Sequence, residues 1–122
     1  MELIKLEGEF AVCKIENLAE VDFAKKFVFL SKTDDEISLL CQVEFVPQTA
    51  VAVEAGWQGL KISGILDFGM IGVISKISGL LAEAGISVFV VSTYNTDYIF
   101  VKAETIDKCI QVLTCNGYEV RQ

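Results

Sequence analysis

The second half of the chain alternates apolar strands with amphipathic helices, and the order of these elements constrains the fold more than any other feature. Short apolar runs rich in β-branched residues predict strands, and apolar residues spaced three and four apart predict helices. The predicted series is a strand over 60–66, a helix over 70–84, strands over 86–91 and 98–102, a helix with the stripe Ile106, Cys109, Ile110 and Leu113, and an edge strand over 118–120. Gly85 and Gly117 follow the two helices, where a C-terminal glycine belongs.

The order βαββαβ predicts an α+β domain of the ferredoxin-like type, with antiparallel strands and helices on one face. The first half of the chain is richer in strands, which are predicted over 3–6, 10–15, 27–30 and 37–42. Only residues 18–26 are long enough for a short helix. Residues 46–56 contain the single proline, Pro47, and are predicted to join the two halves.

An internal similarity relates the two halves. Shifted by 61 positions, Phe27–Ser31 lies over Val88–Ser92, and Glu36 lies over Asp97. In both halves an apolar strand leads into a polar loop, and a carboxylate opens the next strand. The similarity predicts a duplicated unit, with domains over 1–55 and 56–122, in which the first copy lacks most of one helix.

Composition excludes several classes of function. The 122 residues include no histidine, so His-based catalysis and imidazole metal ligands are excluded. Seventeen acidic against ten basic residues give a net charge of −7, which argues against nucleic acid as a partner. No uncharged stretch is long enough to cross a membrane, and the charged first ten residues are unlike a secretory signal. An apolar content of 52% favours a homodimer that covers apolar surface.

The four cysteines form no CxxC pair and have no zinc-like spacing. They are predicted to be reduced thiols in a cytoplasmic protein, the alternative being two disulfides in an exported one. No nucleophile, nucleotide or dinucleotide motif is present, so the sequence predicts neither an enzyme nor a cofactor or metal site.

The junction between the predicted strand 60–66 and the following helix is the first candidate binding site. Gly69 and Gly72 allow a backbone to approach a ligand closely, and a helix that starts there offers free N–H groups to a carboxylate. Asp67 can pair with an ammonium group. Such a site suits a zwitterion. The alternative is a glycine-containing turn in which Asp67 caps the helix.

The loop Ser92–Asp97 is the second candidate site. Its six side chains can all form hydrogen bonds, and they lie between two apolar strands. Ser92, Thr93 and Asp97 are its candidate ligand-binding residues, the alternative being a hairpin whose side chains satisfy their own backbone. The corresponding loop in the first half, 31–36, is more charged and supplies three secondary candidates: Thr33, Asp34 and Glu36.

Several motifs together resemble the ACT domain. They are Gly56-Trp57, Gly64–Phe68, Gly72, Leu81–Phe89 and Ser92-Thr93-Tyr94 followed by Asp97-Tyr98. The chain is most similar to small bacterial tandem-ACT proteins related to CASTOR-type amino-acid sensors and to the aspartokinase regulatory region. Thr33–Ser38 and Phe10–Cys13 resemble the first half of that branch, so the resemblance implies two tandem ACT-like units, the first of them degenerate.

The resemblance implies regulatory binding of a small molecule, most often an amino acid, where two ACT-like units abut. The family's ligand loop then comprises Asp67, Phe68, Gly69, Met70, Ile71 and Gly72, and the CASTOR-type acidic position is Asp97. Relatives tend to have Ser and Thr where Gly69 and Ile71 stand, so backbone N–H groups would bind the ligand carboxylate here. The alternative function is an ACT-fold scaffold without a ligand, whose acidic face docks on a partner enzyme.

Overall fold

The structure is a computed structural model that describes residues 1–65 and 72–122. The chain divides into two compact units, which we call the C-terminal unit (residues 1–7 with 58–122) and the N-terminal unit (residues 8–57). The long strand β5 (Ala52–Ile62) contributes residues to both. This division differs from the expected 1–55 and 56–122 at the first strand. The strand β1 (Glu2–Lys5) belongs to the C-terminal unit because it pairs antiparallel with the end of β5.

The C-terminal unit has the predicted element order. After β5 follow α1 (Val73–Glu83), β6 (Val88–Ser92), β7 (Asp97–Lys102), the short 3-10 helix η3 (Ala103–Thr105), α2 (Ile106–Cys115) and β8 (Glu119–Arg121). The strand order is β6-β7-β5-β1-β8. β1 pairs antiparallel with β5 and parallel with β8, so β8 is an edge strand as predicted. The α+β architecture with antiparallel pairing is confirmed.

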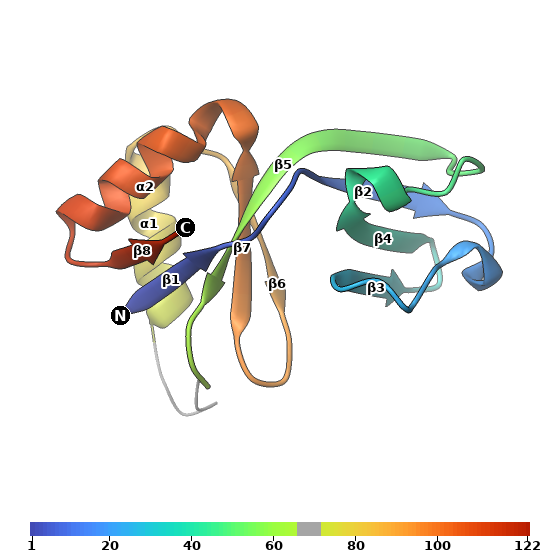
Figure 1. Cartoon of the computed structure of the whole chain (residues 1–122), viewed down its shortest axis with the longest axis horizontal. Helices are drawn as coiled ribbons and strands as arrows, with labels where there is room; N and C mark the ends of the chain where they lie inside the picture. The colour runs from blue at the N-terminus through green and yellow to red at the C-terminus, as the bar shows by residue number, and fades with distance from the viewer. Residues whose placement is uncertain (66–71) are drawn as a thin grey trace. The chain divides into compact units, whose positions relative to one another are not determined.

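One apolar core holds the C-terminal unit together. It lies between the sheet and the two helices, which lie side by side in Figure 1. The fully buried members from the helices are Ile77, Leu81, Cys109 and Leu113. Gly85 ends α1 with a positive φ of 76°. The N–H of Ile86 then donates to the carbonyl of Leu81 at 2.9 Å, which is the bond that defines a Schellman motif. The predicted helix-ending role of Gly85 is confirmed.

The N-terminal unit is a sheet with strand order β3-β4-β2-β5. Its strands β2 (Phe10–Ile15) and β4 (Ile37–Gln42) have the predicted bounds, and β3 spans Val28–Lys32. No α-helix is present in this unit, all of whose residues are described. The prediction of a helix over 18–26 is wrong. Asn17 and Glu20 form a capping box around the three-residue 3-10 helix η1 (Leu18–Glu20), and the extended backbone of Val21 then ends it.

The expectation that residues 46–56 only join the halves is also wrong. From Ala52 onward these residues form the first part of β5, which pairs antiparallel with β2. Residues 51–55 are all exposed, so no apolar alternation marks them as a strand. Backbone bonds hold them instead, starting with the Val51 N–H, which donates to the Lys14 carbonyl at 2.8 Å.

The two hairpins β3–β4 and β6–β7 match at an offset of 60 residues. Val28 pairs with Cys41 as Val88 pairs with Val101, and β4 and β7 have the same order of half-buried and buried positions. The expected offset of 61 is therefore wrong by one residue. In a strand, this error moves each side chain to the opposite face. Thr96, and not Asp97, corresponds to Glu36.

Gly59 on β5 lies against the sheet face that carries Phe100. A methyl group at Gly59 would lie 2.7 Å from Cε1 of Phe100 and 3.0 Å from Cδ1 of Leu6. The Phe100 ring is fully buried and stacks on Phe89, with ring centroids 5.1 Å apart, so it has no room to move. Position 59 therefore requires a glycine, because the backbone of β5 lies too close to the Phe100 ring to leave room for a side chain.

We expect Gly59→Ala to lower the free energy of unfolding by about 1–3 kcal/mol, because the added methyl group overpacks this contact. Urea denaturation followed by circular dichroism measures the change. Gly79→Ala is the matched control, because a methyl group there meets no atom within 4 Å and α1 favours alanine. Equal stability of Gly59→Ala and the wild type would contradict the close approach.

Candidate functional site

The structure describes only part of the predicted ligand loop. Asp67, Phe68, Gly69, Met70 and Ile71 lie outside the described residues. Gly72 immediately precedes α1 with a φ of 81°, and its carbonyl accepts the first helical hydrogen bond, from the Lys76 N–H at 2.9 Å. No side chain caps this helix start among the described residues. The N–H groups of the first turn, residues 73–75, therefore have no partner within α1.

The turn between β6 and β7 is closed by Thr93. Its N–H and its hydroxyl both donate to the carbonyl of Thr96, at 2.8 and 3.0 Å, and the Thr96 N–H donates back to Oγ1 of Thr93 at 3.4 Å. The alternative expected for this loop, a hairpin whose side chains satisfy their own backbone, is confirmed for Thr93. Its hydroxyl orders the turn.

Thr96 fixes this turn to the neighbouring strand. It is the one buried polar side chain among the described residues, with 5% of its surface exposed. Its hydroxyl donates to the carbonyl of Ile62 at the end of β5, at 2.8 Å. A buried hydroxyl needs such a partner, and the bond holds the turn against the strand that leads toward α1. Nothing in the sequence distinguishes Thr96 from the other hydrogen-bonding residues of its loop.

Ser92 and Asp97 face each other at the end of the hairpin. They form the last pair of the β6–β7 register, and the Ser92 hydroxyl donates to Oδ1 of Asp97 at 2.5 Å. Asp97 is half-buried. A carboxylate oriented by a neighbouring hydroxyl keeps its second oxygen available to a cation. The structure thus brings together two of the predicted site residues.

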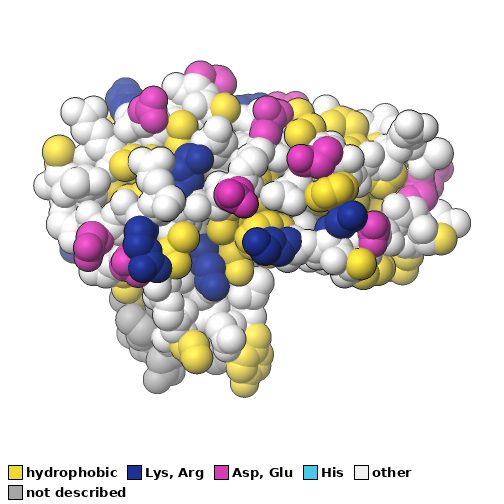
Figure 2. Space-filling model, viewed as in Figure 1, with side chains coloured by type: hydrophobic (Ala, Val, Ile, Leu, Met, Phe, Trp, Pro, Cys, Tyr) yellow, Lys and Arg dark blue, Asp and Glu magenta, His cyan; other side chains and the backbone are white. Residues whose placement is uncertain are grey.

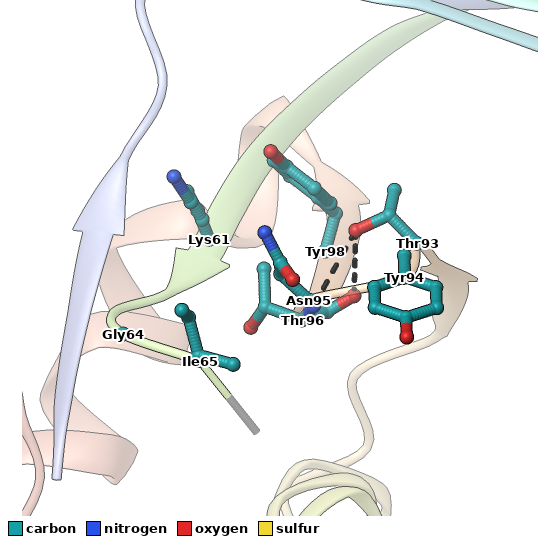
Figure 3. A pocket seen from close by; sticks show the side chains of 8 residues that line it. All are labelled: Lys61, Gly64, Ile65, Thr93, Tyr94, Asn95, Thr96 and Tyr98. Carbon is teal, nitrogen blue, oxygen red and sulfur yellow. Dashed lines mark hydrogen bonds between the residues drawn. The ribbon is translucent and has the colours of Figure 1, made fainter. Parts of the chain in front are cut away.

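A pocket opens beside this turn, with a volume of about 400 Å³. Figure 3 shows Lys61 of β5, Tyr98 of β7 and Asn95 of the turn extending toward the same side. The lining residues are Lys61, Gly64, Ile65, Thr93, Tyr94, Asn95, Thr96 and Tyr98. Of the predicted site residues that the structure describes, Thr93 alone lines it. Lys61 was not among the predicted site residues, and its one sequence signal is a single charge between two apolar neighbours, Leu60 and Ile62, which are buried.

Gly72 lines a different cavity, of about 330 Å³, together with Lys76 of α1 and Tyr118. The Lys76 ammonium lies 6.0 Å from the centroid of the Tyr118 ring, at the outer limit of a cation–π contact. Among the described residues, Gly72 and Thr93 therefore do not share a cavity.

The three secondary candidates form a turn of the same design in the N-terminal unit. The Thr33 N–H donates to the Glu36 carbonyl at 2.9 Å, and the Glu36 N–H donates to Oγ1 of Thr33 at 3.3 Å. Asp34 is exposed, and the Glu36 carboxylate accepts a bond from the Ser38 hydroxyl at 3.0 Å. At the positions of Ser92 and Asp97 this unit has Lys32 and Ile37, so its serine–carboxylate contact joins different strand positions from those in the C-terminal unit.

The cysteines have the state predicted for them. All four are free thiols, and only Cys115 is exposed. Burial raises the pKa of Cys109 to about 11, and burial with the nearby Cys13 and Glu44 raises the pKa of Cys41 to about 11. Burial also raises the pKa of Cys13. These three thiols stay protonated at neutral pH and are poor nucleophiles. Within residues 1–65 and 72–122, no group of three or more His, Cys, Asp or Glu side chains is arranged to hold a metal ion, and no helix could cross a membrane.

Comparison with known proteins identifies related sequences and folds. The model of the ACT domain family matches residues 52–115, more than half of the chain. The crystal structure of protein Atu0741 from Agobacterium tumefaciens has 28% sequence identity and a TM-score of 0.86, with 98% of this chain and 90% of that chain covered. No curated protein sequence matches the chain.

Two further solved structures share the fold. Protein VC0802 from Vibrio cholerae, of unknown function, has 18% identity and a TM-score of 0.72, with 91% of this chain and 85% of that chain covered. The ligand-free regulatory subunit of aspartate kinase from Thermus thermophilus has 9% identity and a TM-score of 0.64, with 90% and 93% covered. At these identities the likeness concerns the fold alone.

Proposed function

Since this chain belongs to the ACT domain family, we propose that it is a non-catalytic regulatory module that binds a small molecule, with an amino acid as the favoured ligand. The absence of histidine from the sequence supports a non-catalytic role. The T. thermophilus structure is that of an enzyme's regulatory subunit, and its likeness in fold supports a partner enzyme for this chain as well. The place of action is then the cytoplasm, where reduced thiols persist.

The ordered carboxylate of Asp97 is the observation that carries the proposal. The Ser92 hydroxyl holds it in one orientation at the end of a hairpin, and a half-buried carboxylate forms strong charge-assisted bonds with an ammonium group. The ligand carboxylate would bind N–H groups at Gly69–Gly72 and at the start of α1, where the helix dipole favours an anion. Asp67 is a second candidate for the ammonium group.

We further propose that the chain consists of two tandem ACT-like units, of the branch that includes CASTOR-type sensors, with a degenerate first unit. The 60-residue offset between the two hairpins supports this proposal, as do the matching turns at Thr33 and Thr93. In the first unit, the three-residue 3-10 helix η1 stands where the second unit has α1. A second 3-10 helix, η2 (Val43–Phe45), matches η3 at the same 60-residue offset, and no α-helix of the first unit corresponds to α2. Because Ile37 stands at the position of Asp97 and the Glu36 carboxylate is exposed, the first unit has no half-buried carboxylate equivalent to that of Asp97.

A thermal-shift panel of the twenty amino acids tests the function. A ligand at a hundred times its dissociation constant stabilises the folded chain by about 2.7 kcal/mol. For a domain of this size, the melting temperature then rises by several degrees. We expect one amino acid, or one chemical group of them, to give such a rise. A flat panel would contradict amino-acid sensing and favour the ligand-free scaffold.

A homodimer completes the proposal, because family ligands sit where ACT-like units abut. The edge strand β6 supports it. Among the described strands β6 pairs with β7 alone, its five residues carry no charge, and Val90 on it is 37% exposed. An uncharged edge strand offers its backbone groups to another strand unless a charge or a bulge protects it.

We expect Val90→Lys to convert the homodimer to a monomer, because a buried lysine opposes edge-to-edge pairing. Sedimentation velocity at micromolar concentration measures the change. Gln111→Lys, which adds the same charge to an exposed position of α2, is the matched control and should remain dimeric. A monomeric wild type, or a dimeric Val90→Lys variant, would contradict this interface.

A further inference from the structure

The described residues that line the pocket beside the β6–β7 turn have a charge opposite to that of the protein as a whole. The chain has a net charge of −7, yet the one charged side chain among the described residues that line this pocket is Lys61. Pocket volumes of about 300 Å³ and above are typical of small-molecule sites, and this one has about 400 Å³. A cationic pocket on an acidic protein points to an anionic ligand.

Lys61 has no carboxylate partner within residues 1–65 and 72–122. Elsewhere Lys25 pairs with Asp22 at 3.8 Å, and Arg121 pairs with Glu2 at 3.5 Å. Lys61 instead extends from β5 between two buried neighbours, and Figure 3 shows its amino group directed toward the same side as the Tyr98 hydroxyl and the Asn95 amide. A cation and two hydrogen-bonding groups on one side of a pocket are the groups that bind a carboxylate.

The rim of the pocket is apolar and exposed. Ile65 and Tyr94 have 77% and 82% of their surfaces exposed, the two highest values among the large apolar side chains described. Hydrophobic side chains project at the lower end of the view in Figure 2, where the β6–β7 hairpin turns in Figure 1. Exposed apolar side chains beside a polar pocket are typical of a binding site for a ligand with an apolar body.

We propose that this pocket binds a small monocarboxylate with an apolar body. The Lys61 ammonium binds the carboxylate, Asn95 and Tyr98 form hydrogen bonds with it, and the apolar body lies against Ile65 and Tyr94. No described lining residue supplies a carboxylate to pair with an ammonium group. The pocket therefore favours a ligand with a carboxylate alone, such as a 2-oxo acid, over the corresponding amino acid, which distinguishes it from the site proposed at Asp97.

Three probes of one shape test this proposal by isothermal titration calorimetry. They are 4-methyl-2-oxopentanoate with a carboxylate only, leucine with both charges, and 3-methylbutylamine with an ammonium only. We expect the oxo acid to bind saturably and the amine not to bind. Lys61→Met should weaken binding of the oxo acid by about ten- to a hundredfold, as the loss of a charge-assisted hydrogen bond predicts.

Lys61→Arg tests the charge, because it keeps the cation and should retain most of the affinity. Lys26→Met, at an exposed position of the N-terminal unit, is the matched control and should bind the oxo acid as the wild type does. Undiminished binding by Lys61→Met would overturn the proposal, as would amine binding equal to that of the oxo acid or no binding of the oxo acid. A flat amino-acid panel with Lys61-dependent binding of the oxo acid would reject the proposed function and leave this pocket standing.

Discussion

Asp97→Asn is expected to weaken binding of the amino acid found in the thermal-shift panel by roughly ten- to a hundredfold, the loss typical of a hydrogen bond to a charged group. Asparagine has the same size, and its carbonyl oxygen still accepts the bond that Ser92 donates to Oδ1. The substitution therefore removes the negative charge and leaves the turn in place. Isothermal titration calorimetry measures the affinity of both proteins.

Two further variants separate the charge at Asp97 from other effects. Asp107→Asn removes a carboxylate from an exposed position in the first turn of α2 and should bind as the wild type does. Ser92→Ala keeps the charge and frees the carboxylate to rotate, so it should weaken binding by a smaller factor than Asp97→Asn. Unchanged affinity in Asp97→Asn would mean that this carboxylate does not hold the ammonium group, and Asp67→Asn would then be the variant to test.

Phe100→Ala is expected to produce the largest loss of stability, about 3–5 kcal/mol, which is the usual effect of deleting a buried aromatic ring. The ring is fully buried on β7 and stacks on Phe89. Its removal takes away both apolar burial and the stacking contact. Urea denaturation measures the free energy of unfolding. Leu113→Ala, in the core between the sheet and the helices, provides a comparison, with an expected loss of about 2–5 kcal/mol.

The double variant Gly59→Ala with Phe100→Ala tests the close approach itself. The methyl group added at Gly59 would fill part of the space vacated by the ring, since Cε1 of Phe100 lies 2.7 Å from its position. Gly59→Ala should therefore cost less in the Phe100→Ala background than in the wild type, as residues in contact are not additive. Full additivity would show that the two residues do not interact in solution.

Much of the C-terminal unit can be predicted from its sequence because each local signal agrees with the fold. The apolar stripe of α2 predicts its buried face at Ile106, Cys109 and Leu113, and Gly85 marks the end of α1. The place of β1 is not predictable in this way. β1 pairs with β5 and β8, which are distant in the sequence, and this pairing depends on tertiary contacts. The sequence of residues 2–5 does not predict which strands they pair with.

The predicted secondary structure of the N-terminal unit is wrong where backbone and capping hydrogen bonds, and not the pattern of apolar residues, determine the local structure. Residues 52–55 are exposed yet belong to a strand. Asn17 caps the start of a three-residue 3-10 helix in the segment that was only long enough for a short α-helix. The offset of 61 failed for a related reason. Apolar residues fill successive positions in these strands, so a one-residue shift still superposes apolar on apolar. The turn closed by Thr33 and Thr93 fixes the offset at 60.

The candidate site was predictable in part. The polar loop Ser92–Asp97 was found because six hydrogen-bonding residues between two apolar strands are conspicuous, and Ser92 and Asp97 indeed meet. The sequence does not separate the roles within the loop, in which Thr93 orders the turn and Thr96 bonds to Ile62. Lys61 was missed because its position in the pocket depends on the pairing of β5 with β7, which brings it to the same side as Tyr98.

An NMR titration of the ¹⁵N-labelled chain with the amino acid from the thermal-shift panel tests the central claim most directly. We expect saturable shifts of the amide signals of Ser92–Asp97 and of the first turn of α1, with a titration midpoint that moves to a roughly ten- to a hundredfold higher ligand concentration in Asp97→Asn. Saturable shifts confined to the N-terminal unit, or no saturable shift with any of the twenty amino acids, would contradict it.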